Sequence, residues 1–205
     1  MFQLERKNIF LLSLLVIFIG ILLRLYQLNF ENYWLDELND FWIADPNISL
    51  DTTFSRRESI GDVSPYLFQS LLKVYFKIFG YFPELGRYVP LFFGALSIPL
   101  LGILSYQIKK DYSFLLTILL ISINIYLIKY SQETRVYSLV FLLSIINLIF
   151  YYKIISPGLT YFKKVYIFIL FIGFSVLCLS THPFLFIIFF FTDCLLCLCI
   201  LRIEK

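Results

Sequence analysis

The sequence predicts an all-α protein, a polytopic transmembrane helix bundle of about six spans with an extracytoplasmic loop that carries an interfacial helix. Three observations lead to this prediction. Of the 205 residues, 60% are hydrophobic and only 15% are charged. The mean hydropathy is +0.84, and long apolar runs follow one another along the chain. A soluble domain cannot bury this much apolar surface, so we expect the protein to be surrounded by the lipid bilayer.

Six apolar runs are candidates for the spans, because a helix needs about 20 mostly apolar residues to cross a bilayer. The first run is too long for the apolar segment of a signal peptide and has no small-residue cleavage site behind it, so we expect a retained span. We expect residues 1–205 to form a single membrane domain. The predicted spans are Asn8–Leu28, Tyr88–Ile108, Tyr112–Ile128, Val136–Tyr152, Val165–Ser180 and Pro183–Leu201.

The lysines and arginines between the spans orient the chain, since cytoplasmic connections carry an excess of these residues. With the N-terminus in the cytoplasm every cytoplasmic connection is basic. The opposite orientation leaves only Lys129, Arg135 and the long loop on that side. We therefore expect a multi-pass plasma-membrane protein with a cytoplasmic N-terminus. The residues then predicted to be cytoplasmic are Arg6, Lys7, Lys109, Lys110, Lys153, Lys163, Lys164, Arg202 and Lys205.

The first extracytoplasmic loop, residues 29–87, contains the stretch "SPYLFQSLLKVYFKIFG". Ser64 is a typical N-cap, Pro65 suits the first helical position and Gly80 ends the pattern. Lys73 and Lys77 are four residues apart and so share one helix face. The remaining residues are mostly aromatic and aliphatic, which predicts a helix in the membrane interface rather than a further span.

The same loop begins with "ENYWLDELND", which places Asp36 and Glu37 side by side soon after an apolar span. Adjacent carboxylates on a helix point about 100° apart, so one can act while the other organises the loop. The aromatic residues around them favour a position at the membrane surface. A carboxylate there can act as a general base toward a hydroxyl group. The alternative is an ordinary solvated acidic loop.

A second polar stretch, "IKYSQETRVYSL", ends the third predicted span and begins the fourth on the same side of the membrane. The fourth span then presents its N-terminus, with free N–H groups and the positive end of its dipole, to that side. Lys129 and Arg135 add cationic charge, and Glu133 can orient Arg135 or a substrate hydroxyl. This pattern predicts a phosphate-binding site. Interfacial anchoring by lysine, tyrosine and arginine is the alternative.

Three further residues are candidates for substrate binding on this side: Asp62, Arg87 and His182, the only histidine. The four cysteines lie in apolar runs and are expected to pack as small hydrophobic residues. We predict no cofactor and no metal site, because the sequence gives no ligand spacing for a metal. A divalent metal held by His182 with Asp36 or Glu37 is left open. The net charge of +3 is too small to indicate a nucleic-acid partner.

Five stretches, taken in order, resemble the N-terminal half of polytopic glycosyltransferases of the C superfamily. They are "YWLDEL", "DVSPYLFQSLLKVYFKIFG", "RYVPLFFGALSIPLLGIL", "YSQETRVYSLVFLLSI" and "STHPFLFII". The branch they resemble is the bacterial dolichyl-phosphate-mannose-protein mannosyltransferase-like family, which includes the aminoarabinose transferases of lipid A. The resemblance covers most of the chain.

The resemblance implies a hexosyl- or pentosyltransferase that moves a sugar from a polyprenyl-phosphate donor to an extracytoplasmic lipid, glycan or protein. Asp36 would be the general base and Glu37 its partner, with Glu133 and Arg135 near the donor phosphate or the acceptor. Members of the family usually have about twice this length and number of spans, and Tyr66 stands where they often have a second proline. The chain is therefore expected to be a fragment, a frameshifted gene product or one half of a split enzyme whose C-terminal half is encoded separately, or else an inactive remnant.

A non-enzymatic membrane protein, such as a transport or scaffold subunit, is the rival interpretation. Transporters place ionisable groups near the middle of their spans. The centres of the predicted spans nearly lack such groups, with Asp193 as the main exception. The sequence therefore favours the glycosyltransferase.

Overall fold

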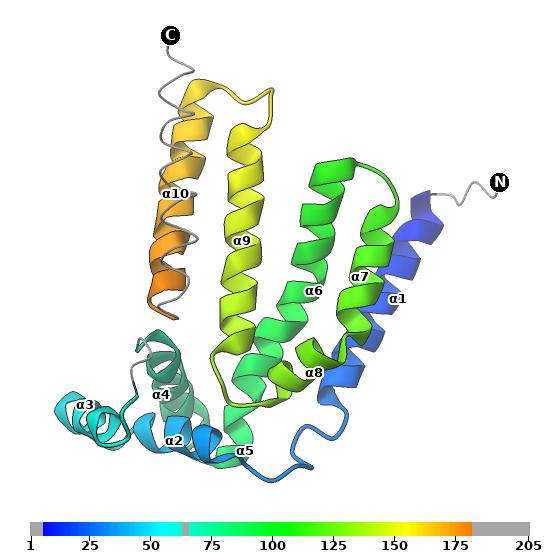
Figure 1. Cartoon of the computed structure of the whole chain (residues 1–205). Helices are drawn as coiled ribbons and strands as arrows, with labels where there is room; N and C mark the ends of the chain where they lie inside the picture. Colours follow the sequence, from blue (N-terminus) through cyan, green and yellow to red (C-terminus); the bar gives the residue numbers. More distant parts are fainter. Residues whose placement is uncertain (1–5, 63–65, 182–205) are drawn as a thin grey trace.

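The computed structural model describes residues 6–62 and 66–181, and within these ranges the chain is all-helical. One group of helices forms a bundle: α1 (Arg6–Leu25), α6 (Tyr88–Lys109), α7 (Ser113–Ile123), α8 (Ile125–Gln132), α9 (Tyr137–Ile155) and α10 (Tyr161–Leu179). In Figure 1 the helices α1, α6, α7, α9 and α10 run roughly side by side, and the short α8 lies across one end of this group. Helix α6 lies centrally, packed against α1, α7, α8 and α9, and α10 packs on α9. The predicted helix bundle is confirmed.

Four of the bundle helices, namely α1, α6, α9 and α10, are long and apolar enough to cross a membrane. Their positions confirm the first, second, fourth and fifth predicted spans. Many large apolar side chains of these helices are exposed, as expected for helices in contact with lipid. The sixth predicted span, Pro183–Leu201, lies outside the described residues.

The third predicted span differs from the prediction, because it is divided into α7 and α8 with a bend of 53° between them. The break is at Asn124, whose backbone is extended (φ −67°, ψ 116°). The Asn124 side chain accepts a hydrogen bond from the Leu127 N–H at 3.0 Å and so caps the start of α8. Asparagine is a favourable N-cap because its side chain satisfies an N–H group that has no partner within the helix.

A buried arginine of α1 donates hydrogen bonds to the backbone carbonyls on the α7 side of this break. Arg24 is 1% exposed, and its guanidinium donates to the carbonyls of Ile121 at 3.0 Å and Ser122 at 3.3 Å. These carbonyls lie at the end of α7, where the helix supplies no donors. The close approach of α1 to α7 requires Gly20, because a Cβ there would lie 2.6 Å from Ser122 Oγ. Arg24 therefore ties α1 to the bent span.

The first long loop folds into a helical layer across one end of the bundle (Figure 1). It contains α2 (Leu35–Ile43), α3 (Leu50–Ser59), α4 (Leu67–Phe79) and α5 (Pro83–Gly86). We call this layer the cap. An apolar cluster joins the cap to the bundle and consists of Ala44, Phe68, Leu72, Phe76, Val89, Val136, Leu139, Leu143 and Cys178. Burial of these side chains positions the cap over the ends of α9 and α10.

Helix α4 confirms the helix predicted within this loop, and it ends at Gly80 (φ 110°), where a glycine is required by the positive φ. The predicted N-terminal residues Ser64 and Pro65 lie outside the described residues. The two lysines have different surroundings. Lys73 donates to the Ile48 carbonyl and to Thr53 Oγ1, both at 2.9 Å, whereas Lys77 is exposed. Lys73 therefore fixes α3 against α4.

The two sets of connections lie at opposite ends of the bundle, as the predicted orientation requires. The α6–α7 and α9–α10 connections share one end with the start of α1, and the α8–α9 connection shares the other end with the cap (Figure 1).

We expect reporter fusions after Lys110 and Lys164 to be cytoplasmic and a fusion after Gln132 to be external, because the basic connections belong on the cytoplasmic side. Paired alkaline phosphatase and fluorescent-protein fusions measure this. An external signal at Lys110 would reverse the orientation.

Candidate functional site

Five of the predicted site residues line one small pocket at the junction of the cap and the bundle. The pocket has a volume of about 190 Å³. We call it the Asp36 pocket, and its walls are Trp34, Asp36, Glu37, Lys129, Tyr130, Glu133, Arg135 and Tyr137. The first three residues come from the start of the cap and the other five from the end of α8, the α8–α9 connection and the first residue of α9. The fold thus brings together segments that are nearly 100 residues apart in the chain.

Glu37 and Arg87 form a buried ion pair beneath this pocket. The Arg87 guanidinium donates from Nε to Glu37 Oε1 at 3.0 Å and from Nη2 to Glu37 Oε2 at 2.9 Å. Both side chains are almost completely buried. The two parallel hydrogen bonds give the pair a fixed geometry as well as a charge attraction.

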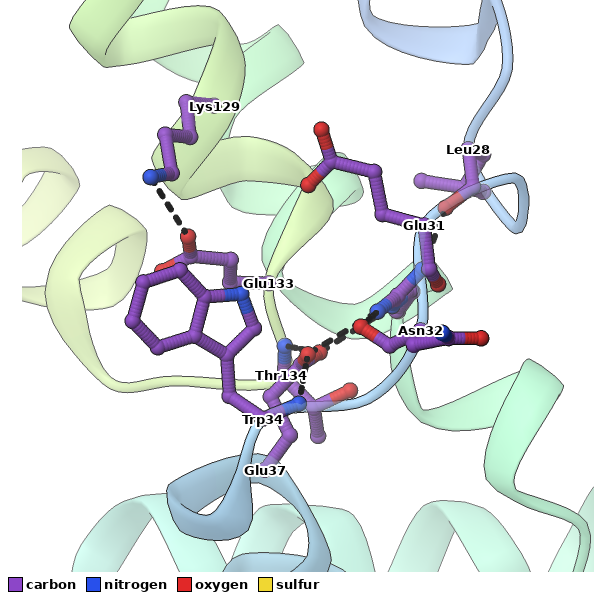
Figure 2. Close-up of polar contacts among 9 residues, drawn as sticks. Leu28, Glu31, Asn32, Trp34, Glu37, Lys129, Glu133 and Thr134 are labelled. Atoms are coloured by element: carbon purple, nitrogen blue, oxygen red, sulfur yellow. Dashed lines mark hydrogen bonds and ion pairs between the residues drawn. The ribbon is translucent and has the colours of Figure 1, made fainter.

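The same two side chains also hold the surrounding backbone. Glu37 Oε1 accepts from the Thr134 N–H at 2.7 Å, and Glu37 Oε2 accepts from the Trp34 N–H at 3.3 Å. Arg87 donates to three backbone carbonyls of the segment between α1 and α2, those of Leu28, Glu31 and Asn32, at 3.0–3.4 Å. Figure 2 shows these contacts around Glu37 and Thr134. Arg87 was predicted as a substrate-binding residue. In the structure all three of its guanidinium nitrogens donate hydrogen bonds to protein oxygens.

Lys129 and Glu133 lie at the rim of the Asp36 pocket, beside the Trp34 ring (Figure 2). They form an ion pair of 3.7 Å between the last turn of α8 and the residue that follows this helix, and Lys129 Nζ is 4.9 Å from the centroid of the Trp34 ring. Burial raises the pKa of the Glu133 carboxyl, and Lys129 counteracts part of this effect. The Lys129 side chain is half exposed, so its ammonium is accessible to an anion.

A second cavity of about 460 Å³ adjoins the Asp36 pocket and shares Trp34, Lys129 and Glu133 with it. Its other walls come from the end of α1, the segment after it and the start of α8, and they include the apolar residues Leu23, Leu28, Phe30, Ile125 and Ile128. Polar and charged residues line it as well, namely Gln27, Glu31, Arg87 and Gln132. The two adjoining cavities therefore both combine charged groups with apolar or aromatic walls.

Arg135 lies between two carboxylates of α2. Its Nη2 is 3.5 Å from Asp36 Oδ2, and its Nη1 is 3.1 Å from Asp40 Oδ2. The Asp36 side chain is 63% exposed and the Asp40 side chain only 5%. Burial is the largest single effect and by itself would lower the pKa of Arg135, but Asp40, Tyr137 and Asp36 together outweigh it and raise the pKa above its usual value. Arg135 is therefore a fixed cation that joins the α8–α9 connection to α2.

Asp40 was not among the predicted site residues, although it lies four residues after Asp36 and so shares its helix face. Its Oδ1 accepts from Gln69 Nε2 of α4 at 2.8 Å, and the same Nε2 lies 3.2 Å from Asp62 Oδ2. Burial raises the pKa of Asp40 to about 6, against the opposing effects of Arg135 and Gln69. The predicted residue Asp62 therefore lies behind Asp40, on the side away from the pocket walls.

Other predicted features lie elsewhere. His182 is outside the described residues, as are three of the four cysteines, while Cys178 is buried in the core. Within residues 6–62 and 66–181, no group of three or more histidine, cysteine, aspartate or glutamate side chains is arranged to hold a metal ion. A larger cavity of about 830 Å³ lies among α1, α6 and α7 at the end of the bundle opposite the cap, and it contains none of the predicted site residues.

Comparison with family models, curated proteins and solved structures finds no significant match. The family resemblance of the five stretches therefore stays a prediction. The chemistry of the site is inferred from its own residues, which are an exposed carboxylate, two cations and an ion pair that fixes the backbone around them.

The buried ion pair leads to a prediction about stability. Glu37→Gln leaves the Arg87 guanidinium buried without its carboxylate, and breaking such a pair typically costs about 3–5 kcal/mol. We therefore expect a clear loss of thermal stability in detergent. Asp36→Asn is the matched control, because Asp36 is exposed and its replacement should change the stability by less than about 0.5 kcal/mol. Equal melting temperatures for the two variants would contradict a stabilising role of the Glu37–Arg87 pair.

Proposed function

We propose that the protein is a membrane glycosyltransferase that moves a sugar from a polyprenyl-phosphate donor to a hydroxyl group of an extracytoplasmic acceptor. The observation that carries this proposal is the Asp36 pocket, where an exposed carboxylate lies beside Arg135 and near Lys129. A carboxylate can accept a proton and the two cations can bind a phosphate. These are the groups that such a transfer requires.

Asp36 is the general base of the proposed reaction. The acceptor oxygen attacks the anomeric carbon of the donor sugar, and the bond between that carbon and the phosphate oxygen breaks with its electron pair leaving on the phosphate. The acceptor hydroxyl loses its proton to the Asp36 carboxylate as the new bond forms. The exposure of Asp36 gives an acceptor access, and its ion pair with Arg135 holds the carboxylate toward the pocket.

Lys129 and Arg135 are the proposed contacts of the donor phosphate, and the adjoining cavity is the proposed site of the first part of the polyprenyl chain. This cavity has apolar wall residues at the end of α1, in the segment after it and on α8, and it shares Lys129 with the Asp36 pocket. A lipid-linked sugar phosphate consists of an apolar chain, then a phosphate, then a polar sugar. In this proposal the chain lies in the adjoining cavity, the phosphate at Lys129 and Arg135, and the sugar in the Asp36 pocket. Glu133 is available to a sugar or acceptor hydroxyl at the rim between the two cavities.

Glu37 and Arg87 act through the backbone in this proposal, since their polar atoms bind each other and the segments that form the pocket walls. His182 remains a candidate phosphate contact. A separately encoded C-terminal half is a proposed partner, because the resemblance concerns only the N-terminal half of a longer enzyme. An inactive remnant remains the alternative, and the assays below are made with such a partner supplied.

The buried Arg24 would favour the rival interpretation, a transport subunit, since buried ionisable groups inside spans are typical of transporters. Its guanidinium, however, donates to carbonyls of Gly20, Ile121 and Ser122. These contacts give it a structural task at the break between α7 and α8. The glycosyltransferase therefore remains the better-supported proposal.

The role of Asp36 is tested by Asp36→Asn, which keeps the size of the side chain but removes the base. We expect normal insertion and donor binding with a loss of sugar transfer of about 10²–10⁴-fold, the usual contribution of a general base. The assay is transfer from polyprenyl-phosphate hexoses and pentoses in membranes with matched protein levels. Asp51→Asn, an exposed carboxylate of α3, should keep full activity. Full activity in Asp36→Asn would remove Asp36 from catalysis.

The phosphate site is tested by Arg135→Ala. Loss of a charged hydrogen bond to phosphate costs about 1.5–3 kcal/mol, which corresponds to a weakening of donor binding of roughly 10- to 150-fold. Binding of the same polyprenyl-phosphate sugars to purified protein measures the effect. Arg56→Ala removes a guanidinium from α3, where it pairs with Asp45, and should leave binding unchanged. Equal donor affinity in Arg135→Ala and wild type would place the phosphate elsewhere.

A further inference from the structure

Arg135 has two carboxylate partners with very different surroundings. Asp36 is exposed and contacts Arg135 loosely at 3.5 Å, whereas Asp40 is buried and contacts it at 3.1 Å. An arginine that faces two carboxylates carries less net positive charge toward a ligand than an arginine that faces one. The ionisation of Asp40 therefore bears directly on what Arg135 can bind.

We propose that Asp40 is a positioning residue whose ionised form holds Arg135 back from an anionic ligand and whose neutral form makes Arg135 available to that ligand. This inference rests on the proposed function, in which the Asp36 pocket receives a phosphodiester. It goes beyond it by assigning control of the pocket to a residue that does not line it.

The hydrogen bonds of Asp40 suit it to this role. Its Oδ1 is held by Gln69 Nε2 at 2.8 Å and its Oδ2 by Arg135 Nη1 at 3.1 Å. The single oxygen of the Gln69 amide, Oε1, is buried and has no hydrogen-bond partner. A ligand can draw the Arg135 guanidinium into the pocket only by weakening its ion pair with Asp40, whose carboxylate is buried and fixed. The ionised Asp40 carboxylate therefore sets the position of the guanidinium.

Two charged groups act on Asp40 from outside its own helix, namely Arg135 and Asp62, and α4 contributes the uncharged Gln69. Asp36 and Glu37 belong to the same helix, and Arg135 faces Asp40 from the α8–α9 connection. Asp62 lies behind Gln69 and is 3.7 Å from Arg57 of α3. The Coulomb effect of Asp62 adds to burial in raising the pKa of Asp40 to about 6, whereas Arg135 and Gln69 act to lower it.

The sign of the pH effect follows from this arrangement. Below about pH 6 Asp40 is largely neutral, and Arg135 faces only Asp36. As the pH rises through this value Asp40 becomes charged, and an anion that binds must either displace this pair or bring a proton with it. A ligand that requires the neutral carboxyl group binds up to about tenfold more weakly for each pH unit above the pKa.

The test uses diethyl phosphate, a phosphodiester with one negative charge at every pH between about 5 and about 8, and the full chain in detergent. We expect its affinity for the wild type to fall as the pH rises above about 6. In Asp40→Asn, which keeps the oxygen that accepts from Gln69 but cannot ionise, the affinity should be independent of pH and roughly 30-fold higher than wild type near pH 7.5. Asp51→Asn should keep the wild-type profile.

The outcomes separate this inference from the proposed function. Binding that is lost in Arg135→Ala but independent of pH in the wild type overturns the role of Asp40 and leaves the phosphate site intact. A wild-type profile that persists in Asp40→Asn, or that disappears only in Glu133→Gln, assigns the titration to another group and also overturns it. Absence of Arg135-dependent binding at every pH overturns the phosphate site itself. If Asp40→Asn does not fold, a wild-type affinity that is independent of pH still overturns the role of Asp40, and a pH profile that is lost in Glu133→Gln overturns it as well.

Discussion

The ion pair between Glu37 and Arg87 is the interaction on which the cap and the candidate site depend. Two buried charges are costly to remove from water, and this cost is offset only when their geometry is good and their remaining hydrogen bonds are made. The Glu37 and Arg87 side chains meet this condition by binding Trp34, Thr134 and the carbonyls between α1 and α2. The pair therefore requires the start of α2, the start of α6 and the α8–α9 connection to meet at one point.

Three carboxylates in the first part of α2 have three different surroundings. Asp36 faces solvent beside Arg135, Glu37 is buried against Arg87, and Asp40 is buried between Arg135 and Gln69. The direction in which each residue leaves the helix decides its surroundings. The exposed carboxylate suits proton transfer, the ion-paired one holds the backbone, and the pKa of the third is raised by burial into the range where its charge can change. Chemically equal residues thus acquire different roles.

The bundle supports the far wall of the site through the bend between α7 and α8. Arg24 binds the last carbonyls of α7, while Gln132 at the end of α8 donates to the carbonyls of Arg24 and Tyr26 at 3.0 and 2.8 Å. Helix α8 is thereby fixed to the end of α1, and Lys129 and Glu133 are presented toward the cap. In an apolar environment an unpaired backbone carbonyl is costly, so a bent span needs such donors. The break that alters the predicted third span also positions the candidate site.

The sequence by itself determined the helix bundle, most of its spans and the helix of the long loop, because apolar runs and turn residues act over short stretches of chain. It also indicated that Asp36, Glu37, Lys129, Glu133 and Arg135 share one side of the membrane, and these residues line one pocket. It did not indicate that α2, α3 and α5 are helices, since these helices have only 9, 10 and 4 residues. Only the tertiary structure decided the partners: Glu37 and Arg87 are 50 residues apart and Asp40 and Arg135 are 95 apart. Burial, which sets the pKa of Asp40 and the role of Arg24, depends on how distant segments pack, and no local pattern of residues contains that information.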